Sequence, residues 1–143
     1  MKMPPQKILI TGVAGFLGSH LAEKLAEMNC KVVGVDNMSG GYEDNIPKNI
    51  EFFDFDCCDL DKMKLVMKDV SVVYHCAATA HEGLSVFSPY HITKNNLLAS
   101  VSVFTAAVSN KVKRIIFCSS MARYGNQQPP FTEDMNPKPV DPY

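Results

Sequence analysis

The 143-residue sequence has almost no net charge and no long apolar run. A formal net charge of −1 gives no basic surface field, so we expect neither nucleic acid nor an anionic membrane as a partner. No segment is apolar for long enough to form a signal peptide or a membrane span, and we therefore expect a cytoplasmic protein. Any anion that this protein binds must be held by local groups.

The five cysteines contain no Cys-x-x-Cys pair; they are Cys30, Cys57, Cys58, Cys76 and Cys118. Most of them lie among apolar residues, which favours buried free thiols over disulfides. We therefore expect no metal site.

The composition is that of an ordered globular protein, with 46% hydrophobic and 20% charged residues and no internal repeat. The length is sufficient for one domain with a core, but not for a cofactor domain and a separate substrate domain. We expect the C-terminal substrate domain of a two-domain enzyme to be absent.

Short apolar runs alternate with segments of helical periodicity. Strands are expected at residues 7–11, 31–35, 50–55, 70–75 and 114–118. Helices are expected at 17–29, at 59–68 with Asp59 as the N-cap, and at 89–110. This alternation predicts a doubly wound parallel α/β sheet in the order 3-2-1-4-5, ending before the last strand of such folds. Residues 126–143 hold five of the nine prolines and are expected to form an extended loop.

Three glycines at a spacing of three, Gly12, Gly15 and Gly18, lie between the first expected strand and helix. A pyrophosphate needs such a turn, because the backbone must approach the phosphates closely. The helix N-terminus then offers free N–H groups and the positive end of its dipole. A tight turn with close helix packing and no ligand is the alternative interpretation.

Asp36 ends the second expected strand, eighteen residues after Gly18. A carboxylate at this point can accept hydrogen bonds from the adenosine ribose and repels a 2′-phosphate. No Arg or Lys lies within residues 37–43 to neutralise such a phosphate. We therefore expect NAD rather than NADP, with a solvated loop acid as the alternative for Asp36.

Five motifs in order resemble the extended short-chain dehydrogenase/reductase family. They are Thr-Gly-x-x-Gly-Phe-x-Gly-Ser-His at 11–20, Val-Asp-Asn-x-Ser-x-Gly at 35–41 with Gly40-Gly41 altering the last spacing, Asp-Cys-Cys-Asp at 56–59, His-Cys-Ala-Ala at 75–78, and Asn96, seven residues after Pro89. The resemblance implies a Rossmann-like NAD-binding domain over residues 1–125. The cofactor-binding residues that it implies are Gly12, Gly15, Phe16, Leu17, Gly18, Asp36, Asn37, Ser39, Gly40, Asp56, Cys57, Cys76, Ala77, Ala78 and Asn96. His75 is also open to interpretation as a satisfied core histidine.

Two residues correspond to the catalytic pair of this family. Ser120, four residues before Tyr124, matches its catalytic Ser or Thr, with Ser119 as the rival. Tyr143, in Asp-Pro-Tyr after the Pro-rich loop 126–143, resembles the Tyr of Tyr-x-x-x-Lys, but the sequence holds no lysine four positions later. A phenol acts as a base near neutrality only when a nearby cation stabilises its anion, so we expect the 143-residue chain alone to be inactive.

The resemblance implies a nucleotide-sugar epimerase similar to the UDP-glucose 4-epimerases. Such an enzyme interconverts sugar epimers through a keto intermediate, by reversible hydride transfer to bound NAD. Met121-Ala122 stands where sugar 4,6-dehydratases carry Asp-Glu, which disfavours a dehydratase. A decarboxylase or reductase of the same family, a non-catalytic NAD-binding module and an unstable fragment are the alternatives. A nucleotide sugar and a second copy of the chain are the partners that the family implies.

Overall fold

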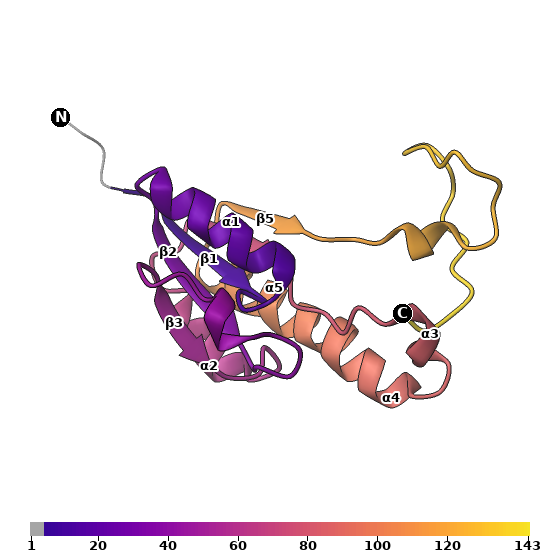
Figure 1. Cartoon of the computed structure of the whole chain (residues 1–143), viewed down its shortest axis with the longest axis horizontal. Helices are drawn as coiled ribbons and strands as arrows, with labels where there is room; N and C mark the ends of the chain where they lie inside the picture. The colour runs from indigo at the N-terminus through magenta and orange to yellow at the C-terminus, as the bar shows by residue number, and fades with distance from the viewer. Residues whose placement is uncertain (1–4) are drawn as a thin grey trace.

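The structure is a computed structural model that describes residues 5–143. Residues 1–4, which belong to the N-terminal stretch and to the expected domain 1–125, lie outside the described residues. The sheet has five parallel strands in the order β3-β2-β1-β4-β5, which confirms the predicted topology (Figure 1). These strands are β1 (Lys7–Thr11), β2 (Lys31–Asp36), β3 (Glu51–Asp54), β4 (Val72–His75) and β5 (Arg114–Phe117).

The helices connect these strands as the periodicity predicted. The helical elements are α1 (Phe16–Glu27), η1 (Glu43–Asn45), α2 (Leu60–Val66), α3 (Glu82–Ser85), α4 (Pro89–Ile92), η2 (Thr93–Leu98), α5 (Ala99–Ser109) and η3 (Met121–Tyr124). The Asp59 side chain accepts a hydrogen bond from the Lys62 N–H, which confirms it as the N-cap of α2. The expected long helix is present as α4, η2 and α5 in direct succession, with a π-helical middle.

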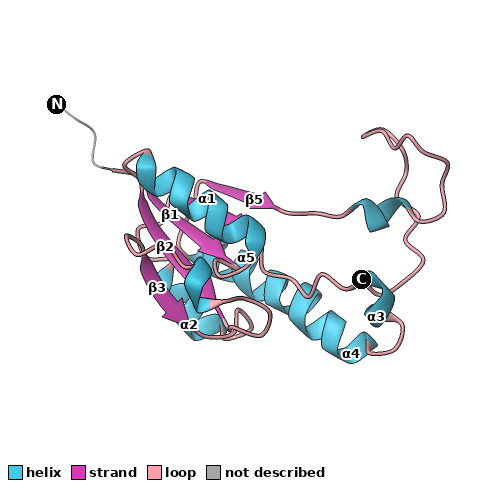
Figure 2. Cartoon of the chain, in the orientation of Figure 1, coloured by secondary structure: helices cyan, strands magenta, loops and turns pink. Residues whose placement is uncertain are grey.

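Helix α1 covers one face of the sheet, and α2 and α5 cover the other (Figure 2), so strand alternation divides the core between two faces. Leu9 of β1 packs in a cluster with Met63 of α2 and Val103 of α5, whereas Ile8 and Ile10 pack in a second cluster with the α1 residues. β1, β2 and β4 therefore form the buried centre, and β5 stays half-exposed at one edge. Within residues 5–143, no helix is long and apolar enough to cross a membrane.

Beyond β5 the chain leaves the sheet, and residues 126–143 contain no helix or strand, as expected for an extended loop (Figure 1). This loop is anchored to η3, because the Lys138 N–H donates to the Arg123 carbonyl at 2.7 Å. The Gln127 side-chain amide donates to the carbonyls of Tyr124 and Asn136. The loop thereby carries the last residues to the carboxyl edge of the sheet, where a cavity lies.

Candidate functional site

Two of the three glycines of the first turn, Gly12 and Gly18, have no room for a side chain. Gly12 has a φ of +71°, and a Cβ built on it would lie 2.7 Å from the Ala77 nitrogen. A Cβ on Gly18 would overlap the Gly12 carbonyl. Gly15 is the N-cap of α1, so no side chain caps the helix. The first turn of α1 also holds no acidic residue. The positive end of the helix dipole is left for an external anion, as a phosphate-binding turn requires.

Asp36 links this turn to the loop after β2. Its Oδ2 accepts the Ala14 N–H at 3.0 Å and its Oδ1 accepts the Met38 N–H at 2.9 Å. The residue is only 8% exposed, so it is not a solvated loop acid. Each carboxylate oxygen has a second lone pair, which leaves capacity for the hydroxyls of a ribose.

The loop after β2 contains three further residues predicted to bind the cofactor, and all three lie at the surface. The Asn37 side-chain Oδ1 accepts both the Ser39 N–H and the Ser39 hydroxyl. Gly40 has open space around it, but a Cβ on the neighbouring Gly41 would lie 2.9 Å from the Ala14 carbonyl carbon. Gly41 is thus the constrained glycine of the pair. The sequence motif did not distinguish the two.

Asp56 and Cys57 follow β3, and their side chains point to different environments. Burial raises the pKa of Asp56, but hydrogen bonds from Cys58 and the charge of Lys94 outweigh it, so its pKa lies below the usual value. The Cys57 thiol belongs to the core, and burial raises its pKa to about 12. Cys57 can therefore contact a cofactor only through its backbone.

A buried chain of hydrogen bonds joins β1, β4 and the long helix through His75, which is 1% exposed. The Ser100 hydroxyl donates to the Asn96 carbonyl and lies 2.9 Å from His75 Nε2. Because Ser100 has one proton, it must accept from an Nε2–H of His75. Nδ1 then accepts the Thr11 hydroxyl at 2.6 Å, and Thr11 Oγ1 in turn accepts the Ala77 N–H.

This relay satisfies both ring nitrogens of a neutral His75, because Nε2 donates to Ser100 and Nδ1 accepts from Thr11. Desolvation accordingly lowers the pKa of His75 to about 4. His75 is a satisfied core histidine that holds the backbone of Ala77, rather than a group that contacts the cofactor itself.

The neutral state of His75 predicts a loss of stability in mild acid. The unfolded chain binds a proton near pH 6.5, whereas the folded chain does so only near pH 4. The contribution of neutral His75 to the free energy of unfolding should be fully present above pH 6.5. The free energy of unfolding should then fall by about 3 kcal/mol as the pH drops to 4. Urea unfolding at several pH values measures this change. His75→Gln should lose that component of the pH dependence, while His81→Gln, at an exposed position, should keep it. Equal slopes in the wild type and His75→Gln would contradict the assignment.

Asn96 lies in the π-helical segment and clamps the chain that follows β4. Its Oδ1 accepts the Thr79 N–H at 2.8 Å, and its Nδ2 donates to the Thr79 carbonyl at 3.4 Å. Asn95 donates to the Thr79 hydroxyl. The two asparagines thus position residues 77–79. The partner Thr79 was not predicted from the sequence, because it matches no motif.

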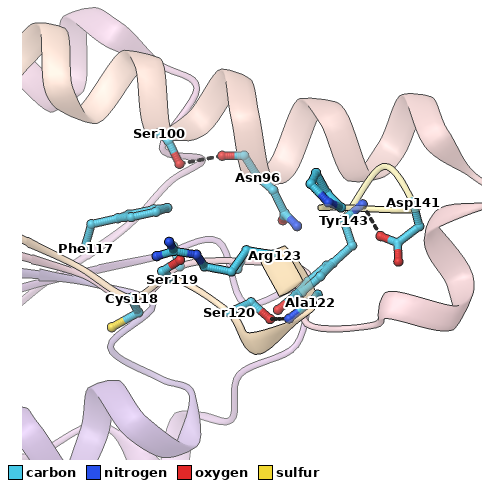
Figure 3. A pocket seen from close by; sticks show the side chains of 13 residues that line it. Asn96, Ser100, Phe117, Cys118, Ser119, Ser120, Ala122, Arg123, Asp141 and Tyr143 are labelled. Atoms are coloured by element: carbon cyan, nitrogen blue, oxygen red, sulfur yellow. Dashed lines mark hydrogen bonds between the residues drawn. The ribbon is translucent and has the colours of Figure 1, made fainter. Parts of the chain in front are cut away.

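A cavity of about 230 Å³ lies at the carboxyl ends of β4 and β5 (Figure 3). Its walls bring together five residues predicted from the sequence, Ala77, Ala78, Asn96, Ser120 and Tyr143. The rival Ser119 and the unpredicted Ser100, Phe117 and Arg123 also line it. The thiol of Cys76 packs instead against the core on the α1 face, and Cys76 does not line the cavity.

Ser120 and Tyr143 are two of the residues with hydroxyl groups that line this cavity. Ser120 Oγ accepts the Ala122 N–H at 3.1 Å and caps η3, so its own proton remains available to donate. The Tyr143 N–H donates to Asp141 Oδ1 at 2.8 Å. The Arg123 guanidinium lies over the Tyr124 ring, 4.9 Å from its centroid. The arrangement can present a hydroxyl donor and a phenol to one bound molecule.

Comparisons with known proteins agree over nearly the whole chain. A family model described as "NAD dependent epimerase/dehydratase family" matches residues 8–143. A putative UDP-glucose 4-epimerase of Methanocaldococcus jannaschii is 37% identical over 95% of this chain and 46% of its own length. A UDP-N-acetyl-alpha-D-glucosaminuronate decarboxylase of Bacillus cytotoxicus is 33% identical over 90% of this chain and 41% of its own length. The chain therefore spans less than half the length of these curated relatives.

Solved structures give the same agreement. A UDP-glucose 4-epimerase of Thermotoga maritima with UDP-glucose has a TM-score of 0.92 at 34% identity, over 96% of this chain and 46% of that one. A UDP-glucose 4-epimerase of Thermus thermophilus in complex with NAD has a TM-score of 0.90 at 30% identity, with the same coverage.

Proposed function

Because the chain belongs to the NAD dependent epimerase/dehydratase family, we propose that it holds NAD and contributes Ser120 and Tyr143 to the epimerisation of a nucleotide sugar. The observation that carries this proposal is the shared cavity. Ser120 and Tyr143 line it together with Ala77, Ala78 and Asn96, at the sheet edge where ligands bind in open α/β folds.

Along the carboxyl edge of the sheet, the residues lie in the order in which the parts of a dinucleotide would bind. The glycine turn leaves no room for a Cβ at Gly12 or Gly18 and presents the uncapped N-terminus of α1, which suits the pyrophosphate. Asp36 ends the adjacent strand β2 and suits the adenosine ribose, and Asp56 follows β3, farther along the same edge. The nicotinamide end would then lie toward β4 and β5, beside the cavity.

The side chains divide the chemistry between them. Bound NAD supplies the hydride acceptor and donor. The free proton of the Ser120 hydroxyl bonds the oxygen of the reacting sugar hydroxyl and fixes its orientation. The Tyr143 phenol would accept the proton of that hydroxyl once a nearby cation stabilises its phenolate. Asn96 and His75 hold the backbone of residues 77–79 that forms the cavity wall.

The relatives support the substrate class that we propose. Several are UDP-glucose 4-epimerases, which favours a UDP-hexose and inversion through a keto sugar. The decarboxylase at 33% identity supports a second candidate, a decarboxylase of the same family. A non-catalytic NAD-binding module is the third, and a second copy of the chain is the further partner that we propose.

Ser120→Ala is expected to lower kcat/KM for the UDP-glucose to UDP-galactose conversion by about 10²- to 10⁴-fold, because the orienting donor is lost. NADH affinity should change by less than about threefold, or about 0.7 kcal/mol. Ser119→Ala, one residue earlier on the same wall, is the matched control and should cost less than about tenfold, or 1.4 kcal/mol. Because the 143-residue chain alone is expected to be inactive, turnover is measured with the full product of the gene, and NADH affinity is measured with both proteins.

The outcomes of this assay distinguish the epimerase from the two other candidate functions and test the role of Ser120. Full activity in Ser120→Ala would exclude its proposed role. NADH binding without turnover of any UDP-hexose or UDP-uronate by the full product would favour the non-catalytic module. Release of carbon dioxide from a UDP-uronate would favour the decarboxylase.

A further inference from the structure

Two thiols meet at the carboxyl edge of the sheet, outside the proposed chemistry. Cys76 follows β4 and Cys118 follows β5, directly after the paired residues His75 and Phe117. The Cys118 N–H donates to the His75 carbonyl at 3.2 Å, which continues the strand pairing. The two Sγ atoms are 3.6 Å apart. Cys118 is exposed and Cys76 is half-buried.

Cys118 borders the cavity that holds Ser120 and Tyr143, whereas the Cys76 thiol lies on the α1 face of the sheet. Cys76 packs against the core cluster of this face. Figure 3 shows the Cys118 sulfur pointing away from Ser120 and Tyr143. Strand alternation explains this orientation, because Phe117 points to the opposite face and contacts the His75 ring.

The strand register is compatible with a disulfide, because Cys76 and Cys118 directly follow the paired His75 and Phe117. Neighbouring strands lie about 4.7–4.9 Å apart. Disulfides join Cα atoms about 4.4–6.8 Å apart, a range that includes this strand spacing. The vicinal Cys57 and Cys58 differ, because the Cys57 thiol is in the core and the Cys58 thiol donates to the Lys94 carbonyl.

We propose that Cys76 and Cys118 form a reversible disulfide site that reacts with small-molecule disulfides, such as oxidised glutathione. The exposed Cys118 loses its proton to solvent and attacks one sulfur of the reagent, which releases one thiol and leaves a mixed disulfide. Cys76 then loses its proton and attacks Cys118 Sγ, which releases the second thiol. Two protein thiols are oxidised and one reagent disulfide is reduced to two thiols.

The order of attack follows from the environments of the two thiols. Burial and the neighbouring Cys118 raise the pKa of Cys76 to about 12, so Cys76 is a poor first nucleophile. It reacts second, when the mixed disulfide holds an electrophilic sulfur within its reach. The inference does not rest on the proposed catalytic function.

The test is incubation of the folded protein with oxidised glutathione, followed by intact mass and peptide mapping. The wild type should lose the mass of two hydrogen atoms and map a Cys76–Cys118 link, and dithiothreitol should reverse both changes. Cys76→Ser should stop as a mixed disulfide with one glutathione on Cys118. Cys118→Ser should form no link, and Cys58→Ser, the matched control, should behave as the wild type.

Three results would overturn the proposal. The first is a wild type that retains five reduced thiols at a reagent concentration that oxidises a model dithiol. The second is a link that maps to Cys57 and Cys58, and the third is a Cys76→Ser variant that forms the same internal link as the wild type. Circular dichroism of each variant checks that the fold is retained, and the wild-type peptide map tests the proposal independently of any variant.

Discussion

Gly12→Ala is expected to lower NADH affinity by at least about 100-fold, or about 2.7 kcal/mol. Gly12 has a φ of +71°, where alanine is strained, and the new Cβ would lie 2.7 Å from the Ala77 nitrogen. The turn must therefore open, which moves the N–H groups that would hold the pyrophosphate. Strain of about 1–2 kcal/mol and crowding of about 1–3 kcal/mol should also lower the free energy of unfolding. NADH fluorescence titration and urea unfolding measure the two effects.

A second variant separates binding from strain. Gly18→Ala introduces no positive-φ strain, but its Cβ would overlap the Gly12 carbonyl, so it should also lose NADH binding. Gly83→Ala is the matched control, because nothing lies within 4 Å of its Cβ position. It should change NADH affinity by less than about twofold, or 0.4 kcal/mol. If Gly12→Ala and Gly18→Ala fold and bind NADH as Gly83→Ala does, the turn is not a phosphate site.

Local pattern was sufficient to predict most of this fold. The apolar run at 7–11 and the glycines after it predicted a buried strand and a tight turn, since both depend on neighbouring residues. The same holds for Asp59, whose capping partner lies three residues away. The strand order followed from alternation and the right-handed crossover rule.

The partners of the site residues could not be predicted in this way. His75 bonds Thr11 and Ser100, which are 64 and 25 residues away in the sequence, and Asn96 bonds Thr79 across a loop that matches no motif. The π-helical turn around Asn96 has the same apolar spacing as an α-helix, so periodicity did not distinguish it. Side-chain direction was also missed, because a motif assigns a residue to a site without saying whether its thiol or its backbone faces it. Cys57 is an example.

Asp36→Ala is expected to weaken NADH binding by about 30- to 100-fold and to reduce the preference for NADH over NADPH. The carboxylate would hold the ribose through charge-assisted bonds worth about 1.5–3 kcal/mol each, and its charge disfavours a 2′-phosphate. Its loss also frees the N–H groups of Ala14 and Met38, so the turn loses order. Affinities for NADH and NADPH, measured side by side, separate the two effects.

Asp36→Asn tests the charge of Asp36 more directly, because it keeps the shape of the side chain and removes its charge. The two oxygens of Asp36 each accept a backbone N–H, and the amide nitrogen of asparagine can accept neither. One buried donor is left unsatisfied, at a cost of about 1–3 kcal/mol of stability. Asp44→Ala, an exposed carboxylate in η1, is the matched control and should leave both affinities unchanged. If Asp36→Asn and Asp36→Ala keep the wild-type ratio of NADH to NADPH affinity, Asp36 does not discriminate between the 2′-hydroxyl and the 2′-phosphate of the ribose. Its role would then be confined to joining the phosphate turn to the loop after β2.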